Sequence, residues 1–302
     1  MPKLSIVTPS FNYEWCIEDA LTSVAKAGSK LPQGWEVEHV VVDDASSDGS
    51  PAILERWAPQ LTLALGHENR GQSQTLNECL SKATGEWMGW LNADDFYLPM
   101  ALYDACSSFG AEADIVFGDV AVTDKSARFI RLLAEHPFSP WTLRWWGTYL
   151  PVGAVFVRRD LLSELRWRED LSLLLDWDLW LRAAARGARF RYVPTPFAAI
   201  RRHDAQESRQ ARPGRLGEKS RVRREQGLPS RPWQWRAIQR VASFDHWGRK
   251  ALTGAYVRQI RSRPLRHRTM RWFDDPEGWS AATTLYRLAY RRKVPDESVL
   301  RA

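Results

Sequence analysis

Residues 85–99 read GEWMGWLNADDFYLP, a tryptophan-rich apolar run that ends in two adjacent carboxylates, Asp94 and Asp95. An apolar run of this kind predicts a buried β-strand, and two like charges at its end repel each other. The pair has two interpretations. Either the acids cap the turn that precedes Pro99, a common use of aspartate, or they hold a divalent cation through hard oxygen ligands. Taken by itself, the dipeptide favours the turn.

Three further apolar runs precede this one, and helical patterns separate all four. Each run is short and nearly continuous, while the intervening stretches have apolar residues at helical spacing. This alternation predicts an α/β fold with a mostly parallel sheet that helices cover on both faces. The predicted strands are 4–10, 36–46, 61–67 and 86–95, and the helices between them are 13–27, 50–60 and 73–83. Further strands are predicted at 113–122, 153–159 and 189–203, with a helix at 173–188.

The first four strands end in polar residues that can bind a ligand. The carboxyl ends of parallel strands meet at one edge of a sheet, and ligands of such sheets bind there. Asp44 can accept a hydrogen bond from a nucleobase N–H, although the acids of this segment, Asp48 among them, could instead cap the helix near Ser50. Gly71 permits close approach of the backbone to a ligand. We therefore expect one crevice built from 8–10, 43–44, 69–71 and 94–95.

The composition indicates a globular protein without a membrane span. Of the 302 residues 44% are hydrophobic and 16 are tryptophan, which excludes a disordered chain. The cysteines Cys16, Cys79 and Cys106 have no CxxC spacing, so they predict a reducing compartment rather than disulfides or a zinc site. The longest apolar run, 150–157, is far shorter than the roughly 20 residues needed to cross a bilayer. We expect a cytoplasmic protein without a signal peptide.

Charge is distributed unevenly along the chain. Residues 1–200 carry 18 basic and 26 acidic side chains, whereas residues 201–302 carry 25 and 10. The character changes in a charged, Pro- and Gly-containing stretch, so we predict a catalytic domain at 1–205 and a basic helical region at 206–302. Five tryptophans among the arginines of that region suit helices that attach to an anionic membrane. The alternative is a helical extension packed on the first domain.

Five motifs, in this order and spacing, resemble the family 2 glycosyltransferases of GT-A fold. They are LSIVTPSFN, VVVDDASSDGS, ENRGQSQTLNECLSKATGEWMGWLNADD, GAVFVRRDLL and LDWDLWLRAAARG, within residues 3–208. The third motif is similar to enzymes that assemble bacterial cell-surface polysaccharides such as O-antigen. The resemblance implies an inverting, metal-dependent transfer of a sugar from a nucleoside diphosphate sugar, with UDP favoured. The acceptor would be a hydroxyl of a glycan or of a lipid-linked acceptor.

The resemblance also assigns roles to ten residues. It places Asp176 as the general base. It implies a divalent cation, Mg²⁺ or Mn²⁺, at Asp95 and Asp94, with His203 approaching the diphosphate or the metal. Asp94 would also face the ribose, and Asp44 would bond the uracil ring. The nucleotide-binding set is Thr8, Pro9, Ser10, Asp44, Asn69, Gly71 and Asp94.

Three positions depart from the commonest pattern of the family. Asn92 stands where many members have a third acid, so metal affinity rests on the two aspartates after it. Ala45 replaces a frequent glycine after the uracil-binding acid. Leu175 replaces an acid that often precedes the base, which removes a like charge beside Asp176.

Other functions explain fewer of these features. The sequence pI near 9.5 would suit nucleic-acid binding, but that leaves the acidic strand ends unexplained, and we expect no nucleic-acid partner. A dinucleotide oxidoreductase would have a G-x-G-x-x-G motif after the first strand, and a nucleotidyltransferase would have a Gly-rich basic loop there. This sequence has neither motif at that position. An inactive scaffold would not need Asp44, Asp95 and Asp176. For single residues, Asp176 could instead pair with Arg182 or Arg186, and His203 could be a solvated loop residue.

Overall fold

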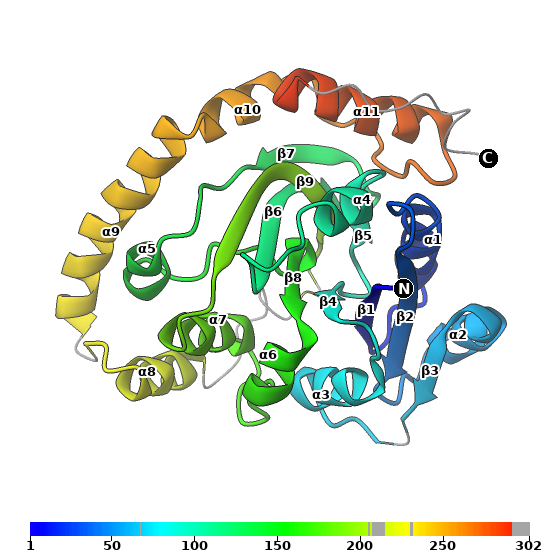
Figure 1. The fold of residues 1–302 in the computed structure, drawn as a ribbon, viewed down its shortest axis with the longest axis horizontal. Helices are drawn as coiled ribbons and strands as arrows, with labels where there is room; N and C mark the ends of the chain where they lie inside the picture. The colour runs from blue at the N-terminus through cyan, green and yellow to red at the C-terminus, as the bar shows by residue number, and fades with distance from the viewer. Residues whose placement is uncertain (67, 205, 207–214, 230–231, 292–302) are drawn as a thin grey trace.

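The computed structural model describes residues 1–66, 68–204, 206, 215–229 and 232–291. Nine strands of these residues form one sheet: β1 (Lys3–Ser10), β2 (Glu36–Asp43), β3 (Thr62–Leu65), β4 (Trp87–Trp90), β5 (Phe96–Tyr97), β6 (Ile115–Asp124), β7 (Phe129–Leu133), β8 (Val155–Arg158) and β9 (Phe190–Arg202). Their order is β3-β2-β1-β4-β8-β6-β9-β5, with β7 paired to β6 (Figure 1). The predicted α/β class is confirmed.

Helices surround this sheet along its whole length (Figure 1). The α-helices are α1 (Ile17–Gly28), α2 (Ser50–Trp57), α3 (Gln72–Lys82), α4 (Ala101–Cys106), α5 (Pro140–Trp145), α6 (Arg159–Leu165), α7 (Leu175–Ala185), α8 (Arg215–Glu225), α9 (Pro232–Leu252), α10 (Ala255–Arg261) and α11 (Pro276–Tyr290). Single 3₁₀ turns are η1 (Ala58–Gln60), η2 (Val152–Ala154) and η3 (Arg263–Leu265). None of the helices in the described ranges is both long and apolar enough to cross a bilayer.

The first four strands are parallel, as predicted. Their register brings the strand ends level, because Ser10 pairs with Asp43 and Asp43 pairs with Leu65. Helices α1, α2 and α3 connect these strands in the order expected from the sequence. The polar residues after β1, β2 and β3 therefore lie at one edge of the sheet.

The second half of the sheet is mixed rather than parallel. Strand β8 lies between β4 and β6 and is antiparallel to both, while β9 is parallel to β6. The direction of β8 could not be read from its sequence, since a strand buried on both faces is apolar in either orientation. The strands β5 and β7 were not predicted, because their two and five residues are too few to show a period.

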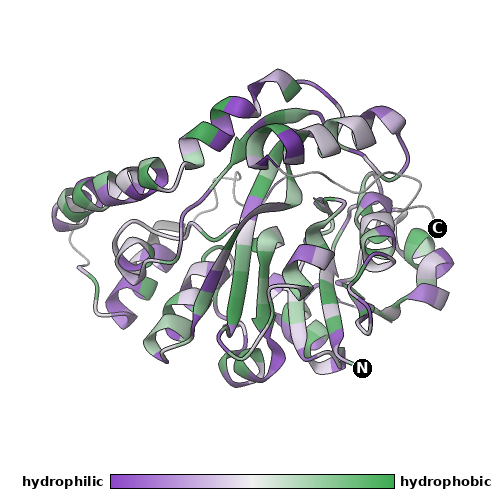
Figure 2. Ribbon diagram, turned by 45° about the horizontal axis from the view of Figure 1, so that its top comes forward, coloured by the Kyte–Doolittle hydropathy of each residue, from purple (hydrophilic) through white to green (hydrophobic). Residues whose placement is uncertain are grey.

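Two hydrophobic clusters flank the sheet on opposite faces. Along β1, Leu4 and Ile6 belong to one cluster and Val7 to the other, as side-chain alternation in a strand requires. Figure 2 shows the central strands as largely hydrophobic, whereas the surrounding helices mix hydrophilic and hydrophobic residues. The sheet is thus buried on both faces.

The C-terminal helices share the core of the sheet. Trp272 donates its indole N–H to the carbonyl of Tyr97 at 2.8 Å, and the Tyr286 hydroxyl donates to the carbonyl of Pro196 at 3.1 Å. Leu285, on α11, is fully buried in the same cluster as Leu4 of β1. The region after residue 205 is therefore packed against the first one, and a division into two domains at that residue remains a prediction.

Candidate active site

A cavity of about 550 Å³ lies at the carboxyl ends of β1 and β2; we name it the loop cavity. It is lined by five of the predicted nucleotide-binding residues: Pro9, Ser10, Asp44, Asn69 and Gly71. The segment 169–172 forms another part of its wall. The expected convergence of the strand ends is thus observed for the first three strands, and the volume is in the usual range for a small-molecule site.

Asp44 fixes the loop that follows β3. Its Oδ1 accepts the backbone N–H of Arg70 at 2.9 Å, and its Oδ2 accepts that of Gly71 at 2.8 Å. Gly71 has φ +87°, a left-handed conformation that favours glycine, and this geometry turns both amides toward the carboxylate. Each carboxylate oxygen keeps a lone pair that can accept a further bond from a ligand.

The alternative role of Asp44 as a helix cap is not observed. Gly49 occupies the N-cap of α2, and Asp48 accepts the backbone N–H of Ser50 at 2.9 Å. Ala45 adopts φ +64°, which explains why glycine is common at this position.

Two residues near the end of β1, Ser10 and Thr8, have different positions relative to the site. The Ser10 hydroxyl is buried without a hydrogen-bond partner in the structure and lies in the wall of the loop cavity, so it is available to a ligand. Thr8 lines neither this cavity nor the neighbouring one; its hydroxyl lies 2.9 Å from Nε2 of His39. Burial lowers the pKa of His39 to about 3, so this imidazole is neutral.

A smaller cavity of about 170 Å³, the central cavity, adjoins the loop cavity. The two share four lining residues: Pro9, Tyr13, Gln72 and Ser172. Asp94 and Asp176 both line the central cavity, so residues from the fourth strand end and from α7 lie on one continuous surface with Asp44. Asp95 and His203 line neither cavity, so the convergence that the sequence predicted is observed for Asp44, Asp94 and Asp176 but not for these two residues.

The acidic pair after β4 is held by the end of β9. Asp94 Oδ2 lies 2.9 Å from Nε2 of His203, and Asp95 Oδ1 accepts the backbone N–H of Arg201 at 2.9 Å. The Arg201 guanidinium is buried, donates to the carbonyl of Asp94 at 2.9 Å and pairs with Asp19. Burial and the neighbouring charge of Asp94 raise the pKa of Asp95 well above its usual range.

This donor set suits a hard divalent cation. Two adjacent carboxylates with one imidazole nearby offer ligands for Mg²⁺ or Mn²⁺, and a bound cation would relieve the repulsion between the acids. Within the described ranges, no three His, Cys, Asp or Glu side chains are grouped to hold a metal ion by themselves. The remaining positions would have to come from diphosphate oxygens and water, which is how Mg²⁺ is usually held beside phosphates.

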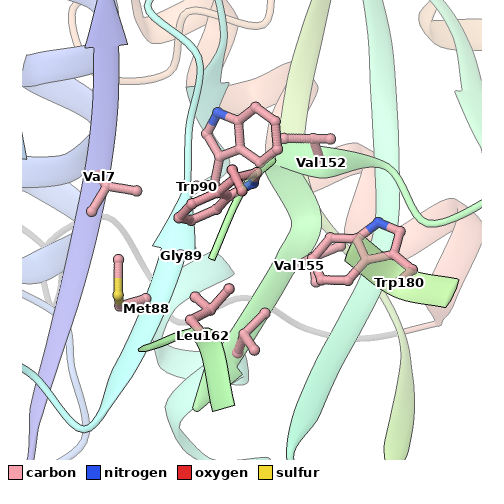
Figure 3. A pocket seen from close by; sticks show the side chains of 10 residues that line it. Val7, Met88, Gly89, Trp90, Val152, Val155, Leu162 and Trp180 are labelled. Carbon is pink, nitrogen blue, oxygen red and sulfur yellow. The ribbon is translucent and has the colours of Figure 1, made fainter. Parts of the chain in front are cut away.

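Asn92 supports this site rather than adding a charge to it. Its Oδ1 accepts the indole N–H of Trp90 at 2.9 Å and the amide N–H of Gln72 at 3.2 Å. A neutral residue here therefore ties β4 to the first turn of α3. Behind Trp90 lies a small apolar space between β4, β8 and α7, lined by ten residues of which none is charged (Figure 3). It is part of the core.

Asp176 lies in the first turn of α7 and faces the central cavity. Its Oδ1 accepts the backbone N–H of Trp177 at 2.7 Å, and burial raises its pKa to about 6. The predicted alternative, a pair with Arg182, is wrong, because Arg182 donates to Asp178 Oδ2 at 2.6 Å. Leu175 is buried in the core, so an acid at that position would be desolvated.

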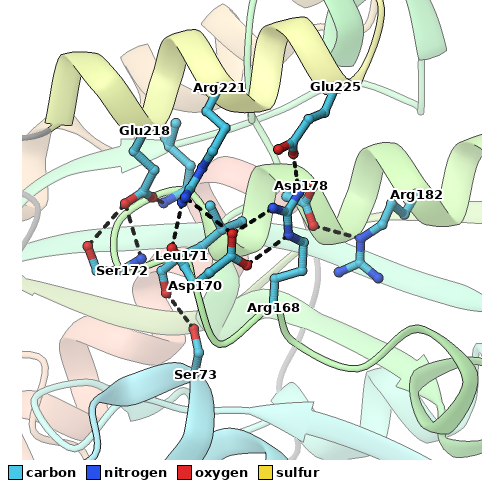
Figure 4. A network of polar contacts seen from close by, with 11 residues as sticks. Ser73, Arg168, Asp170, Leu171, Ser172, Asp178, Arg182, Glu218, Arg221 and Glu225 are labelled. Carbon is cyan, nitrogen blue, oxygen red and sulfur yellow. Dashed lines mark hydrogen bonds and ion pairs between the residues drawn. The ribbon is translucent and has the colours of Figure 1, made fainter.

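The start of α7 is held by α8, a contact that the sequence did not reveal (Figure 4). The Glu218 carboxylate accepts backbone N–H groups from 172, 173 and 174, at 3.2, 2.9 and 2.7 Å. Arg168 pairs with Asp170 and with Glu225 of α8. Because Ser172 lines both cavities, α8 positions part of the site wall. No sequence signal marks this contact, since its partners lie 46 positions apart.

The fold and this site define a class of protein: a GT-A α/β fold with a nucleotide-sized cavity beside an acidic pair. The sequence profile of glycosyl transferase family 2 matches residues 5–164, more than half of the chain. The chain therefore belongs to glycosyl transferase family 2.

Two curated bacterial proteins are similar to this chain in sequence. The succinoglycan biosynthesis protein ExoU of Rhizobium meliloti is 30% identical over 195 residues, which are 58% of this chain and 57% of that protein. The putative glycosyltransferase EpsE of Bacillus subtilis is 26% identical over 198 residues, 62% of this chain and 69% of that protein. The chain thus aligns with less than two thirds of the ExoU protein.

Solved structures of glycosyltransferases share the fold. TarS 1–349 of S. aureus in complex with UDP-GlcNAc has a TM-score of 0.60 at 17% identity, and the match covers 95% of this chain and 81% of that one. The mannosyltransferase PcManGT from Pyrobaculum calidifontis, in complex with GDP-Man and Mn²⁺, has a TM-score of 0.56 at 20% identity, covering 99% and 79%.

Proposed function

We propose that this protein transfers a sugar, with inversion, from a nucleoside diphosphate sugar to a hydroxyl of a glycan or of a lipid-linked acceptor in cell-surface polysaccharide biosynthesis. The observation that carries the proposal is the continuity of the loop and central cavities, which brings Asp44, Asp94 and Asp176 onto one surface. UDP is the favoured carrier, by resemblance and because TarS was solved with UDP-GlcNAc. PcManGT, solved with GDP-Man, has the same fold, so the donor has to be measured.

In this proposal the nucleoside occupies the loop cavity. The Asp44 carboxylate accepts a base N–H, and the Ser10 hydroxyl, which has no partner in the structure, bonds the nucleotide. Asn69 and Gly71 line the cavity beside the nucleoside. Thr8 does not contact the nucleoside; its hydroxyl contacts His39 and so holds the end of β1. The sugar then extends into the central cavity, toward Asp176.

The diphosphate lies beside the acidic pair. Asp95 and Asp94 would hold Mg²⁺ or Mn²⁺, with His203 as a further ligand or as a partner that orients Asp94. A bound cation would supply charge neutralisation for the departing diphosphate. The backbone of Arg201 keeps Asp95 in place, and its guanidinium holds the carbonyl of Asp94.

Asp176 removes the proton of the attacking hydroxyl. A carboxylate with a pKa of about 6 is ionised at neutral pH yet more basic than an ordinary aspartate, as a general base requires. The hydroxyl oxygen attacks the anomeric carbon as the bond to the diphosphate breaks. One such displacement inverts the configuration at that carbon.

The test is a panel of UDP-, dTDP- and GDP-sugars, measured with and without Mn²⁺ or Mg²⁺ on wild type and Asp176→Asn. We expect one donor to be used, only with metal, and a loss of transfer of about 10³-fold in the variant, because general bases contribute 10²–10⁴-fold. Nucleotide binding by calorimetry should be unchanged. The matched control is Asp160→Asn, which alters an aspartate outside both cavities. Equal transfer by Asp176→Asn would reject the assigned base, and no turnover of any donor would favour an inactive scaffold.

A peripheral contact with an anionic membrane is the second part of the proposal. Helix α9 carries exposed apolar side chains that fall on one side at 100° per residue, and α10 continues them: Trp233, Val241, Phe244, Leu252, Val257 and Ile260. Phe244 is 72% and Leu252 is 90% exposed. Exposed arginines accompany this ridge: Arg236, Arg240, Arg263, Arg266 and Arg268. Apolar wedges with basic flanks are typical of interfacial helices.

Vesicle sedimentation tests this contact. The protein should bind vesicles that contain phosphatidylglycerol, and binding should fall with added NaCl and in Leu252→Asp. Absence of binding at every salt concentration would contradict the membrane contact and leave the transferase proposal untouched.

A further inference from the structure

A third cavity, of about 590 Å³, opens on Asp176 from beyond the central cavity; we name it the outer cavity. Asp176 and Val152 line both. The outer cavity is formed by the segment 131–135, the segment 146–152, and side chains of α9 and α10. In Figure 1, α9 and α10 arch around β7 and α5 and so close this side of the molecule. The only predicted site residue on this wall is Asp176.

Aromatic rings dominate the wall of the outer cavity. They are Trp146, Tyr149, Trp247 and Tyr256. Trp247 is 52% and Tyr256 is 36% exposed, so both present ring surface that no other part of the described chain covers. Trp146 lies flat against His246, with ring centroids 4.1 Å apart, and this stacking holds it in place. Exposed, fixed aromatic rings beside a few buried polar groups are the usual composition of a small-molecule site.

One buried carboxylate oxygen in this wall has no partner. Glu135 is 2% exposed, and its Oε1 accepts a hydrogen bond from Nζ of Lys250 at 2.9 Å. Its Oε2 makes no hydrogen bond within the described residues. Nε2 of His246 lies 3.9 Å from it, but burial lowers the pKa of His246 to about 3, so this imidazole is uncharged. A buried acceptor without a partner costs free energy, and a ligand hydroxyl would satisfy it.

The charges of the outer cavity balance. Glu135 and Asp176 are acidic and Arg131 and Lys250 are basic; Lys250 is paired with Glu135, whereas Arg131 forms no ion pair within the described residues. A phosphate would therefore meet one unpaired cation beside two carboxylates, whereas an uncharged polyhydroxyl ligand needs acceptors and apolar faces. A neutral pyranose has both an apolar C–H face and hydroxyl donors.

We propose that the outer cavity is the acceptor site and that it takes a neutral pyranose at the end of a glycan. This inference rests on the function proposed above. The sugar stacks on Trp247, one hydroxyl donates to Glu135 Oε2, and another points at Asp176. That hydroxyl loses its proton to the Asp176 carboxylate, its oxygen bonds the anomeric carbon, and the electron pair of the broken bond leaves with the nucleoside diphosphate. The C-terminal helices thereby select the acceptor.

The test uses the full chain and variants at two exposed aromatic residues, one on α9 and one on α4. Trp247→Ala removes the proposed platform, and Tyr103→Ala, which alters an aromatic residue that is 38% exposed and lines none of the three cavities, is the control. The probes are the 4-nitrophenyl β-glucoside, β-galactoside and β-N-acetylglucosaminide, with ribitol 5-phosphate as the anionic comparison. We expect Trp247→Ala to raise the KM of the accepted glycoside about tenfold, equivalent to one stacking contact. The donor KM and the hydrolysis of donor by water should not change, and Tyr103→Ala should behave as wild type.

A binding measurement separates this inference from the function itself. Saturation-transfer NMR with the same glycosides should show ring contacts that are lost in Trp247→Ala and kept in Tyr103→Ala. If no donor is turned over but this pattern is seen, the proposed function fails and the sugar site stands. An unchanged acceptor KM and unchanged NMR contacts in Trp247→Ala, or use of ribitol 5-phosphate alone, would overturn the inference.

Discussion

The loop cavity and the outer cavity each adjoin the central cavity but are constructed in different ways. In the loop cavity, two backbone amides donate hydrogen bonds to Asp44 and fix one wall. Other lining residues, such as Pro9 and Ser10, come from the ends of neighbouring parallel strands. The wall of the outer cavity depends on side chains that meet across the chain, such as Glu135 and Lys250, which are 115 positions apart. Hydrogen bonds of the backbone preorganise a site, so that little entropy is lost when a ligand binds. Exposed aromatic side chains contribute little to the packing of the fold, so they can be substituted more easily.

This difference predicts how substitutions in the loop cavity and in the outer cavity will affect activity. A change in the loop cavity affects a nucleotide that many enzymes share, and it disturbs the sheet edge as well. A change in α9 or α10 alters the acceptor wall without touching the strands. We therefore expect donor-side substitutions to abolish activity and acceptor-side substitutions to shift preference.

The largest effect is expected at the acidic pair. In Asp95→Asn the amide oxygen can still accept the backbone N–H of Arg201, so the fold should survive while a negative metal ligand is lost. We expect transfer to fall about 10³-fold or more, since a cation supplies several kcal/mol of charge stabilisation and each 1.36 kcal/mol is about tenfold in rate. Metal titration followed by activity, with thermal melting as the control for folding, checks this. Full activity of Asp95→Asn in a strong chelator would contradict the metal site.

The pH dependence of kcat should reflect the protonation of Asp176. Because burial raises its pKa to about 6, the carboxylate takes up a proton at a higher pH than an ordinary aspartate, and the base is then lost. Other titratable groups of the two cavities that Asp176 lines include Asp94, Glu135, His246 and Lys250. Burial raises the pKa of Glu135 to about 7, so the profile is measured in Glu135→Gln as well as in wild type. In Glu135→Gln we expect kcat to be constant above the pKa of Asp176 and to fall about tenfold per unit below it. A flat profile down to pH 5 would remove Asp176 from the proton transfer.

A smaller effect is expected where Asp44 holds the glycine loop. Asp44→Asn leaves one acceptor oxygen for two backbone amides, so one of them loses its bond. The donor KM should rise about tenfold, because one buried hydrogen bond to a charged group is worth roughly 1.5–3 kcal/mol. The kcat should change little. Asp48→Asn, in the same turn but outside both cavities, serves as the control, and equal donor KM values in the two variants would contradict the role of Asp44.

The smallest effect is expected from α8. Glu218→Ala frees three backbone amides before α7, and loss of such a cap costs about 1 kcal/mol. We expect a donor KM about threefold higher and a lower melting temperature. Glu225→Ala on the same helix, which breaks only the pair with Arg168, should leave the donor KM unchanged. Indistinguishable variants would show that α8 does not position the site wall.

The sequence predicted the donor half of the molecule well, for a physical reason. Strands β1 to β4 have continuous apolar patterns, and parallel strands direct their ends to one edge, so Asp44 and Asp94 could be placed before the structure was known. The partners of Asp44 were not predicted, because loop geometry at Gly71 is set by tertiary contacts. The same holds for the direction of β8, which its apolar pattern does not encode.

The outer cavity could not be predicted at all. Its lining joins Arg131, Tyr149 and Trp247, and no local period links segments so far apart. The basic region suggested either a membrane surface or a helical extension packed on the first domain. The structure shows the packing, through Trp272 and Tyr286, but no sequence pattern named these contacts. Side chains that act in pairs across long distances leave no pattern in a single sequence.

The central claim is that donor and acceptor meet at Asp176 from opposite cavities, so that the hydroxyl attacks away from the departing diphosphate. The most direct test is the anomeric configuration of the product, determined by NMR with the α-linked donor that the panel identifies. The account predicts a β-linked product. An α-linked product would contradict it.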